Sequence, residues 1–192
     1  VRWYLIKDIS LGQDGDFQNK RFVDIINNDL ANTIGNLLNR TSSMSRKWFD
    51  NKVPNKVDNS INNRLASLSR DVIKSYINNF DSYKLDLAAN EILGLAINTN
   101  LYLNEMQPWV LIKEESNKTL VSEIIYCVLE STRIIGLLLL PILPDLAAKI
   151  DSQLGYIYKD NIEWMEQLDW GILEANSLLP KPVPIINKLD YE

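Results

Sequence analysis

The sequence predicts an all-α protein, an antiparallel bundle of four or five main helices. Its 192 residues include only seven Gly and seven Pro, and several long stretches contain neither. Apolar residues recur at helical spacing through most of the chain, whereas strand-like alternation is sparse. Because amphipathic helices bury their apolar stripes against one another, a helical bundle is the fold that these observations favour.

The expected bundle spans residues 16–155 and follows a connecting arm. The arm, residues 1–15, is expected to be irregular or extended and to end in the turn-prone segment Gly12–Gly15. Asp16 can cap the first helix, and Asp58 or Asn59 can cap the third. Helices are predicted at about residues 18–28, 29–48, 59–80, 83–106, 119–140 and 144–154.

Prolines mark the later boundaries. Pro108 is expected to open a new helical turn, and Pro141 and Pro144 to separate the last two helices. Residues 156–192 are aromatic and proline-rich, which indicates a wrapping C-terminal tail with one short helix near residues 161–167.

The composition argues against independent catalysis. The single cysteine, Cys127, excludes an internal disulfide and a thiolate zinc cluster, and the chain has no histidine, the commonest general base and metal ligand. The most apolar stretch, Ile134–Leu143, is too short to cross a bilayer, so we expect no membrane partner. No signal peptide is visible, and a start at Val1 without Met suggests an excised fragment.

Positive charge is concentrated in one part of an acidic chain. The net charge is −5, yet residues 36–76 hold eight Lys or Arg against three acids, an excess of five. From residue 77 onward eight basic residues face seventeen acids, a deficit of nine. A local basic segment can meet RNA phosphates even in an acidic protein, although a solvated helical face has the same composition.

Three local patterns together resemble the methionyl-tRNA synthetase family. The first is Gly12–Phe17 followed by Asn27–Asn32, and the second, Gly35–Thr41, continues directly from it. The third is Asn100–Leu103 with Pro108-Trp109, which synthetases for other aliphatic amino acids share. The resemblance covers nearly the whole chain, since the opening and closing segments also resemble the family's.

The resemblance implies a class I anticodon-binding domain that is cut away from its catalytic domain. The parent enzyme would use ATP with magnesium to activate methionine and transfer it to tRNA in the cytoplasm. The fragment itself would hold no cofactor and no catalytic residue, and would bind methionine-specific tRNA with a CAU anticodon, not DNA. Residues Ser42–Lys47 superficially resemble the family's ATP-binding KMSKS loop, but their position predicts a helix segment instead.

The candidate RNA-reading residues are Asn36, Arg40 and Trp109. Asn36 and Arg40 are four apart, so on a helix they project from one face and can address a base edge. Trp109 follows Pro108 and would offer a flat surface for stacking. Without the resemblance, Asn36 and Arg40 would more often be a plain surface pair and Trp109 a core residue. The resemblance reverses this expectation.

Secondary candidates are weaker. Asn39 and Asn100 match family positions and are expected to be mainly structural hydrogen-bonding residues, and Tyr102 a core residue. Lys52 and Lys56 could contact phosphates. The remaining tryptophans are interpreted as packing residues: Trp3, Trp48, Trp164 and Trp170.

Two alternatives remain open from the sequence. One keeps the class and changes the amino acid: an anticodon-binding domain of a synthetase for isoleucine, valine, leucine or cysteine. The other is a helical protein–protein docking module in which apolar surface around Trp109 binds a partner helix.

Overall fold

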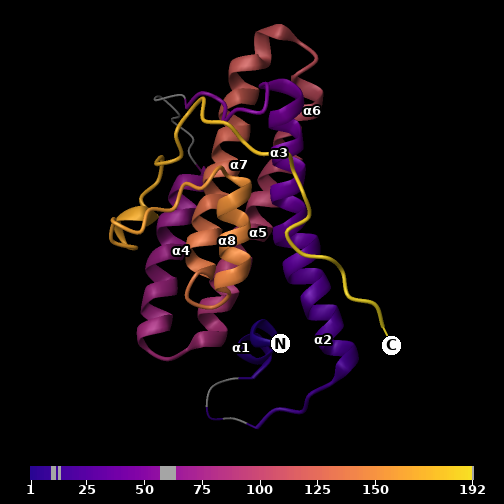
Figure 1. Cartoon of the computed structure of the whole chain (residues 1–192), viewed down its shortest axis with the longest axis vertical. Helices are drawn as coiled ribbons and strands as arrows, with labels where there is room; N and C mark the ends of the chain where they lie inside the picture. The colour runs from indigo at the N-terminus through magenta and orange to yellow at the C-terminus, as the bar shows by residue number, and fades with distance from the viewer. Residues whose placement is uncertain (10–11, 13, 57–63, 192) are drawn as a thin grey trace.

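The chain folds as a helical bundle, which confirms the predicted class. A computed structural model describes residues 1–9, 12, 14–56 and 64–191 (Figure 1). The described residues form no strand beyond one isolated antiparallel bridge between Lys52 and Leu178. Their helical elements, in order, are α1 (Arg2–Asp8), α2 (Asn19–Ile25), the π-helix η1 (Ile26–Gly35), α3 (Asn36–Trp48), α4 (Arg64–Asp81), α5 (Leu85–Met106), α6 (Pro108–Leu111), the 3-10 turn η2 (Glu115–Asn117), α7 (Lys118–Leu139), α8 (Pro144–Gln153) and the 3-10 turn η3 (Glu166–Leu168).

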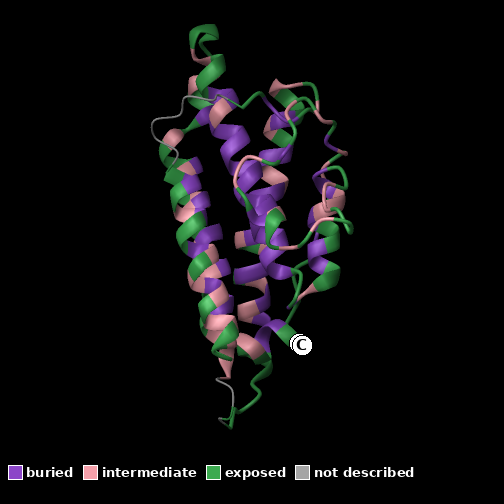
Figure 2. Cartoon of the chain, turned by 90° about the vertical axis from the view of Figure 1, so that its left-hand side faces the viewer, coloured by how far each residue is buried: buried purple, intermediate pink, exposed green. Residues whose placement is uncertain are grey.

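Helix α7 forms the centre of the bundle. It packs against α3, α4, α5 and α8, and every residue from Val121 to Leu139 except Glu123 is buried. A helix that is apolar around its whole circumference is stable only inside other elements. The surrounding helices turn their buried sides inward and their exposed sides to solvent (Figure 2).

The N-terminal arm differs from the prediction, because it begins with helix α1 instead of an extended segment. A seven-residue helix is marginal by itself, so tertiary packing must stabilise it. Trp3 and Tyr4 are buried, and the Trp3 indole Nε1 donates a hydrogen bond to Asp29 at 2.9 Å. Asp16 does not cap the next helix, whose N-cap is Gln18 without a side-chain hydrogen bond.

The predicted break near residues 28 and 29 was also wrong. Elements α2, η1 and α3 form one uninterrupted helical run from Asn19 to Trp48. Asp29, at the predicted boundary, has a tertiary role instead. Asp29 is buried and accepts hydrogen bonds from Trp3 and from the Lys7 ammonium, at 2.9 and 2.6 Å. Its charge is therefore satisfied inside the fold and does not end the helix.

The later boundaries agree more closely with the sequence. Helix α5 ends at Met106 as predicted, Pro108 occupies the first turn of α6, and Pro144 that of α8. The predicted caps at residues 58 and 59 lie outside the described residues. Residues 161–165 are not helical, so the short helix expected near 161–167 was misplaced; the element found there is the 3-10 turn η3, Glu166–Leu168.

A buried ion pair holds the C-terminal tail against α7. The Arg133 guanidinium contacts the Glu130 carboxylate through Nε at 2.9 Å and Nη2 at 2.7 Å, and it also donates to the carbonyls of Gln167 and Asp169. Glu130 in turn accepts backbone N–H bonds from residues 171, 172 and 173. The tail thus crosses the bundle along a fixed path. None of the helices in the described stretches is both long and apolar enough to span a membrane.

Candidate nucleic-acid interface

Helix α3 presents Asn36 and Arg40 on its outer side. Leu37, Leu38 and Thr41 on the opposite side are buried, with Thr41 bonded to the backbone one turn earlier. Asn36 is exposed and Arg40 is half-buried. Because four residues make about one helical turn, the two polar side chains stand one above the other, as the sequence predicted.

A sharp turn places Trp109 at the surface. Gln107, between α5 and α6, adopts the left-handed conformation with φ 46° and ψ 55°, which is unusual for a residue with a side chain. Pro108 then packs inward as the first residue of the four-residue helix α6. Trp109 follows with 37% of its surface exposed, so part of its ring is accessible to a ligand.

The three elements converge at Arg40. Its guanidinium carbon lies 5.7 Å from the centroid of the Trp109 ring, a cation–π distance, and its Nη2 donates to the Asn104 amide oxygen of α5 at 3.3 Å. The structure therefore brings Arg40 and Trp109 into contact, with Asn36 one turn away on α3. An aromatic face, a guanidinium and an amide on one exposed surface can stack on a base and bond its edge.

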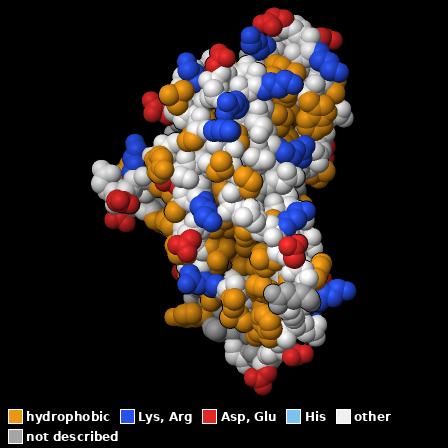
Figure 3. Space-filling view, turned by 45° about the vertical axis from the view of Figure 1, so that its right-hand side comes forward, with side chains coloured by type: hydrophobic (Ala, Val, Ile, Leu, Met, Phe, Trp, Pro, Cys, Tyr) orange, Lys and Arg blue, Asp and Glu red, His pale blue; other side chains and the backbone are white. Residues whose placement is uncertain are grey.

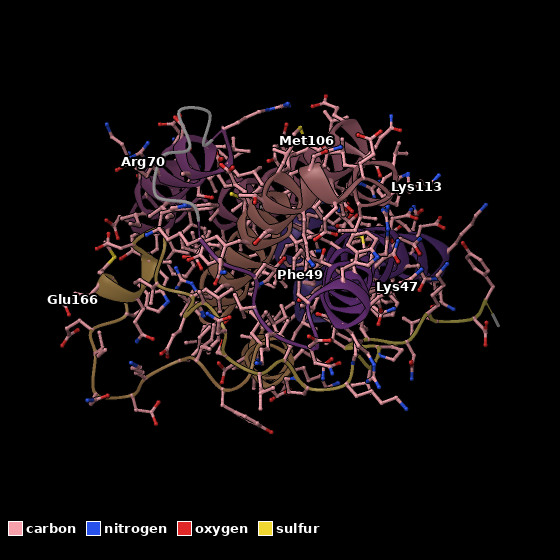
Figure 4. The ribbon with its side chains drawn as sticks, turned by 90° about the horizontal axis from the view of Figure 1, so that it is seen from above. Lys47, Phe49, Arg70, Met106, Lys113 and Glu166 are labelled. Carbon is pink, nitrogen blue, oxygen red and sulfur yellow. The ribbon has the colours of Figure 1, made fainter. Side chains whose placement is uncertain are left out.

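Basic side chains surround this surface. Arg46 and Lys47 end α3 and are exposed, and Lys113 follows α6. Figure 4 shows Lys47 and Lys113 on one side of the molecule, with Arg70 on the other. In the view of Figure 3, Lys and Arg side chains lie around hydrophobic side chains in the upper part of the molecule, with Asp and Glu side chains at its top end. Each of these cations can pair with a phosphate group, while Glu114 and Glu115 directly follow Lys113.

The secondary candidates fall in different places. Asn100 donates to the carbonyls of Thr33 and Ala96, at 3.1 and 3.0 Å, which fits the structural role expected of it. Asn39 is half-buried beside Asn36.

The two lysine candidates lie next to other segments. Lys52 lines a hollow between the loop after α3 and the start of α7, and its backbone pairs with Leu178. Lys56 lies against the tail, because a Cβ atom added at Gly171 would lie 2.8 Å from the ammonium nitrogen of Lys56. The contacts of Arg40 are with Asn104 and Trp109 and include neither lysine.

The other aromatic residues pack as the sequence predicted. Trp3 is fully buried, and the remaining tryptophans other than Trp109 are partly buried against the core. Tyr102 is likewise partly buried there, and its burial raises the pKa of the phenol. Residues Ser42–Lys47 are helical, as their position predicted.

Sequence reasoning missed Asn104 and Lys113 as parts of this surface. Asn104 lies one turn after Asn100 on α5, and this spacing was the only signal that it faces the same side. Its contact with Arg40 joins residues 64 apart in the chain, which no local pattern indicates.

Comparison with known proteins decides the family. The family model described as the anticodon binding domain of methionyl tRNA ligase matches residues 53–182, and the model for class I tRNA synthetases (M) matches residues 1–42. The chain belongs to the methionyl-tRNA ligase family. Asn36 and Arg40 fall within the second match and Trp109 within the first, so the candidate surface combines both.

Relatives from distant bacteria support the assignment. The chain is 39% identical to a methionine–tRNA ligase of Thermosynechococcus vestitus, covering 98% of this chain and 37% of that protein. It is 35% identical to the one from Listeria innocua, covering 100% and 29%. The free methionyl-tRNA synthetase of Mycobacterium tuberculosis superposes with a TM-score of 0.91 at 30% identity, covering 100% of this chain and 39% of that one. The chain thus spans less than two fifths of these relatives.

Proposed function

We propose that this chain reads the CAU anticodon of methionine-specific tRNA through Asn36, Arg40 and Trp109. The observation that carries the proposal is the stacking of Arg40 over Trp109 on an exposed surface, 5.7 Å apart, with Asn36 one turn away. The matching family models and the relatives named above favour methionine over isoleucine, valine, leucine or cysteine.

Each residue has a distinct role in this proposal. The Trp109 ring stacks on one unstacked anticodon base, an interaction available to every base. Arg40 and Asn36 then supply discrimination by bonding base edges. Arg40 uses one recorded hydrogen bond, to Asn104, of the five that its donors allow. It is therefore held in place, and most of its donors remain available for a ligand.

The parent activity belongs to the same proposal. The intact enzyme would activate methionine with ATP and magnesium and pass the methionyl group to the tRNA in the cytoplasm. A related synthetase from M. tuberculosis is known in complex with methionyl-adenylate, the intermediate that such a reaction forms. ATP and magnesium would bind the catalytic domain, and this chain would supply anticodon discrimination.

The test is binding of the intact ligase to anticodon stem-loops that carry CAU or one substituted base. We expect each substitution to weaken binding and the affinity for CAU to fall steeply with salt, since phosphate contacts release counterions. Equal binding of all stem-loops would refute anticodon reading. Salt-independent capture of an apolar helix at the Trp109 surface would support the docking alternative instead.

A further inference from the structure

The last part of the tail lies directly against the helix that carries Asn36. In Figure 1 the yellow C-terminal segment runs beside the indigo helical run of η1 and α3. Ile185 is buried. Gly35 faces it closely, because a Cβ atom added at Gly35 would lie 3.6 Å from the Ile185 side chain and 3.5 Å from that of Ile186. The segment Pro184–Lys188 therefore packs onto the helix backbone immediately before Asn36.

Side-chain hydrogen bonds to α2 and η1 fix the chain that follows this segment. The Asn27 amide exchanges two hydrogen bonds with the backbone of Leu189, donating to its carbonyl at 2.9 Å and accepting from its N–H at 2.8 Å. The Tyr191 hydroxyl donates to Asp24 on α2. With Ile185 buried on one side of Lys188 and Leu189 clamped on the other, the backbone that carries Lys188 is held in place.

A cavity of about 300 Å³ lies between this segment and the helix. The residues that line it are Ala31, Asn32, Gly35, Asn36, Asn39, Pro184, Ile185, Ile186 and Lys188. The polar side chains among them are three amides and one ammonium, and none is acidic. Amides can bond the edge of any base, Pro184 offers a flat apolar surface, and an ammonium suits a phosphate. Lys188 forms no ion pair with a carboxylate among the described residues.

Asn36 belongs both to this cavity and to the surface around Arg40 and Trp109. A single strand stacked on Trp109 and bonded by Asn36 would therefore continue toward the tail. We propose, on the basis of the function proposed above, that the tail forms a second nucleotide subsite. Asn39 contacts the base that neighbours the one on Trp109, and Lys188 binds its phosphate.

The experiment measures binding of the intact ligase to CAU stem-loops over a range of salt concentrations. Lys188→Ala is compared with Lys181→Ala, which removes an exposed lysine of the same tail outside the cavity. Lys188→Ala should weaken binding several-fold and lower the salt slope by about 0.7, the value for one phosphate of a single strand. Lys181→Ala should leave both unchanged.

A second arm identifies the base. Stem-loops with one abasic nucleotide at each loop position are combined with Asn39→Ala, with Trp109→Ala, and with Asn90→Ala on the exposed side of α5 as the control. Asn39 should couple to a position adjacent to the one that couples to Trp109, and Asn90 to none.

The outcomes separate the two proposals. Coupling of Trp109 to one loop position, with Lys188→Ala and Asn39→Ala indistinguishable from their controls, overturns the tail subsite and leaves anticodon reading in place. Absence of coupling for Trp109 and Asn39 alike overturns both. A lower salt slope for Lys188→Ala without coupling of Asn39 to a base overturns the subsite as proposed, because Lys188 would then be a phosphate contact alone.

Discussion

Two arginines in this molecule occupy opposite environments. Arg133 is 2% exposed on α7, and four hydrogen bonds recorded from its guanidinium go to Glu130 and to tail carbonyls. Arg40 is half-buried on α3, and its recorded contacts are one hydrogen bond to Asn104 and the face of Trp109. Both guanidiniums join segments far apart in the chain, yet only one is saturated by the protein.

The difference indicates what each residue can do. A buried guanidinium needs nearly all of its donors satisfied internally, because an unpaired buried charge is strongly destabilising. Arg133 therefore stabilises the fold and has little capacity left for a ligand. A partly exposed guanidinium is solvated by water, which a base can replace. Arg40 is held in position by Asn104 and Trp109 and retains donors for RNA.

The largest expected effect is on the saturated arginine. Arg133→Met should lower the free energy of unfolding by about 3–5 kcal/mol, because it leaves Glu130 buried without its counter-charge. Chemical denaturation of the chain measures this. The matched control is Lys118→Met, which removes an exposed pair with Glu115 at the same i,i+3 spacing and should cost less than about 1 kcal/mol. Equal losses in the two variants would contradict the distinction between the arginines.

Cys127 provides an independent measure of the same effect. It lies one turn before Glu130, and burial raises the pKa of its thiol to about 12. The reactive thiolate is therefore scarce in the folded protein at neutral pH. Thiol labelling should be slow in the parent chain and in Lys118→Met, and faster in Arg133→Met because the protein opens more often. Unchanged labelling of Arg133→Met would mean that the pair does not hold this region closed.

The raised thiol pKa also predicts the direction of a pH effect. The folded state keeps Cys127 protonated up to about pH 12, whereas the unfolded thiol ionises near its ordinary value of 9.0. Between these values the unfolded state binds fewer protons, so its free energy falls relative to the folded state. The stability of the chain should therefore decline as the pH rises above 9. Cys127→Ala should reduce that decline, measured by denaturation at pH 8 and 10.

Trp109 should affect RNA binding and leave the fold nearly unchanged. Trp109→Ala removes a stacking surface worth about 1–3 kcal/mol per base, which corresponds to about a 5- to 150-fold loss of affinity for a CAU stem-loop. Trp109→Phe, which keeps an aromatic face, should retain most of the affinity. If Trp109→Ala unfolds the domain while the folded fraction still recognises CAU, the residue is a core tryptophan.

Arg40 should couple to Trp109. Arg40→Ala should weaken binding and relax discrimination at one anticodon position, since a lost base-edge contact reduces specificity. The two side chains lie 5.7 Å apart and would engage the same base, so the double variant should lose less affinity than the sum of the single losses. Simple additivity in a double-mutant cycle would place the two residues on different bases.

The parts of this site that the sequence predicted are those that depend on local geometry. The spacing of Asn36 and Arg40 fixes their common face on any helix, and Pro108 fixes the start of α6. The identity of the family came from motifs. By contrast, the contacts of Arg40 with Asn104 and of the tail with Gly35 join residues 64 and 150 positions apart. Local periodicity carries no information about such pairs.

The errors in the fold prediction have the same origin. Charged residues are rarely buried in a helix, and Asp29, at the predicted boundary, is an exception. Trp3 and Lys7 of α1 satisfy Asp29, and helix α1 is itself stabilised by that contact. A buried Asp29 is unfavourable without the donors of α1, and the short helix α1 is marginal without its contact to Asp29. The sequence pattern, interpreted one segment at a time, therefore missed helix α1 in the arm and predicted a helix break where the structure has none.

The smallest expected effect concerns the phosphate contacts around the Trp109 surface. Lys47→Ala and Lys113→Ala should each weaken binding of all stem-loops alike, without changing discrimination, and lower the salt slope by about one phosphate contact. Lys52→Ala and Lys56→Ala test the positions first predicted for this role. Arg70→Ala is the control, because it lies on the other side of the molecule (Figure 4). A slope that responds to Lys52 or Lys56 and not to Lys47 or Lys113 would place the RNA backbone along the loop after α3. A response to Arg70 would mean that binding follows total charge and not a defined path.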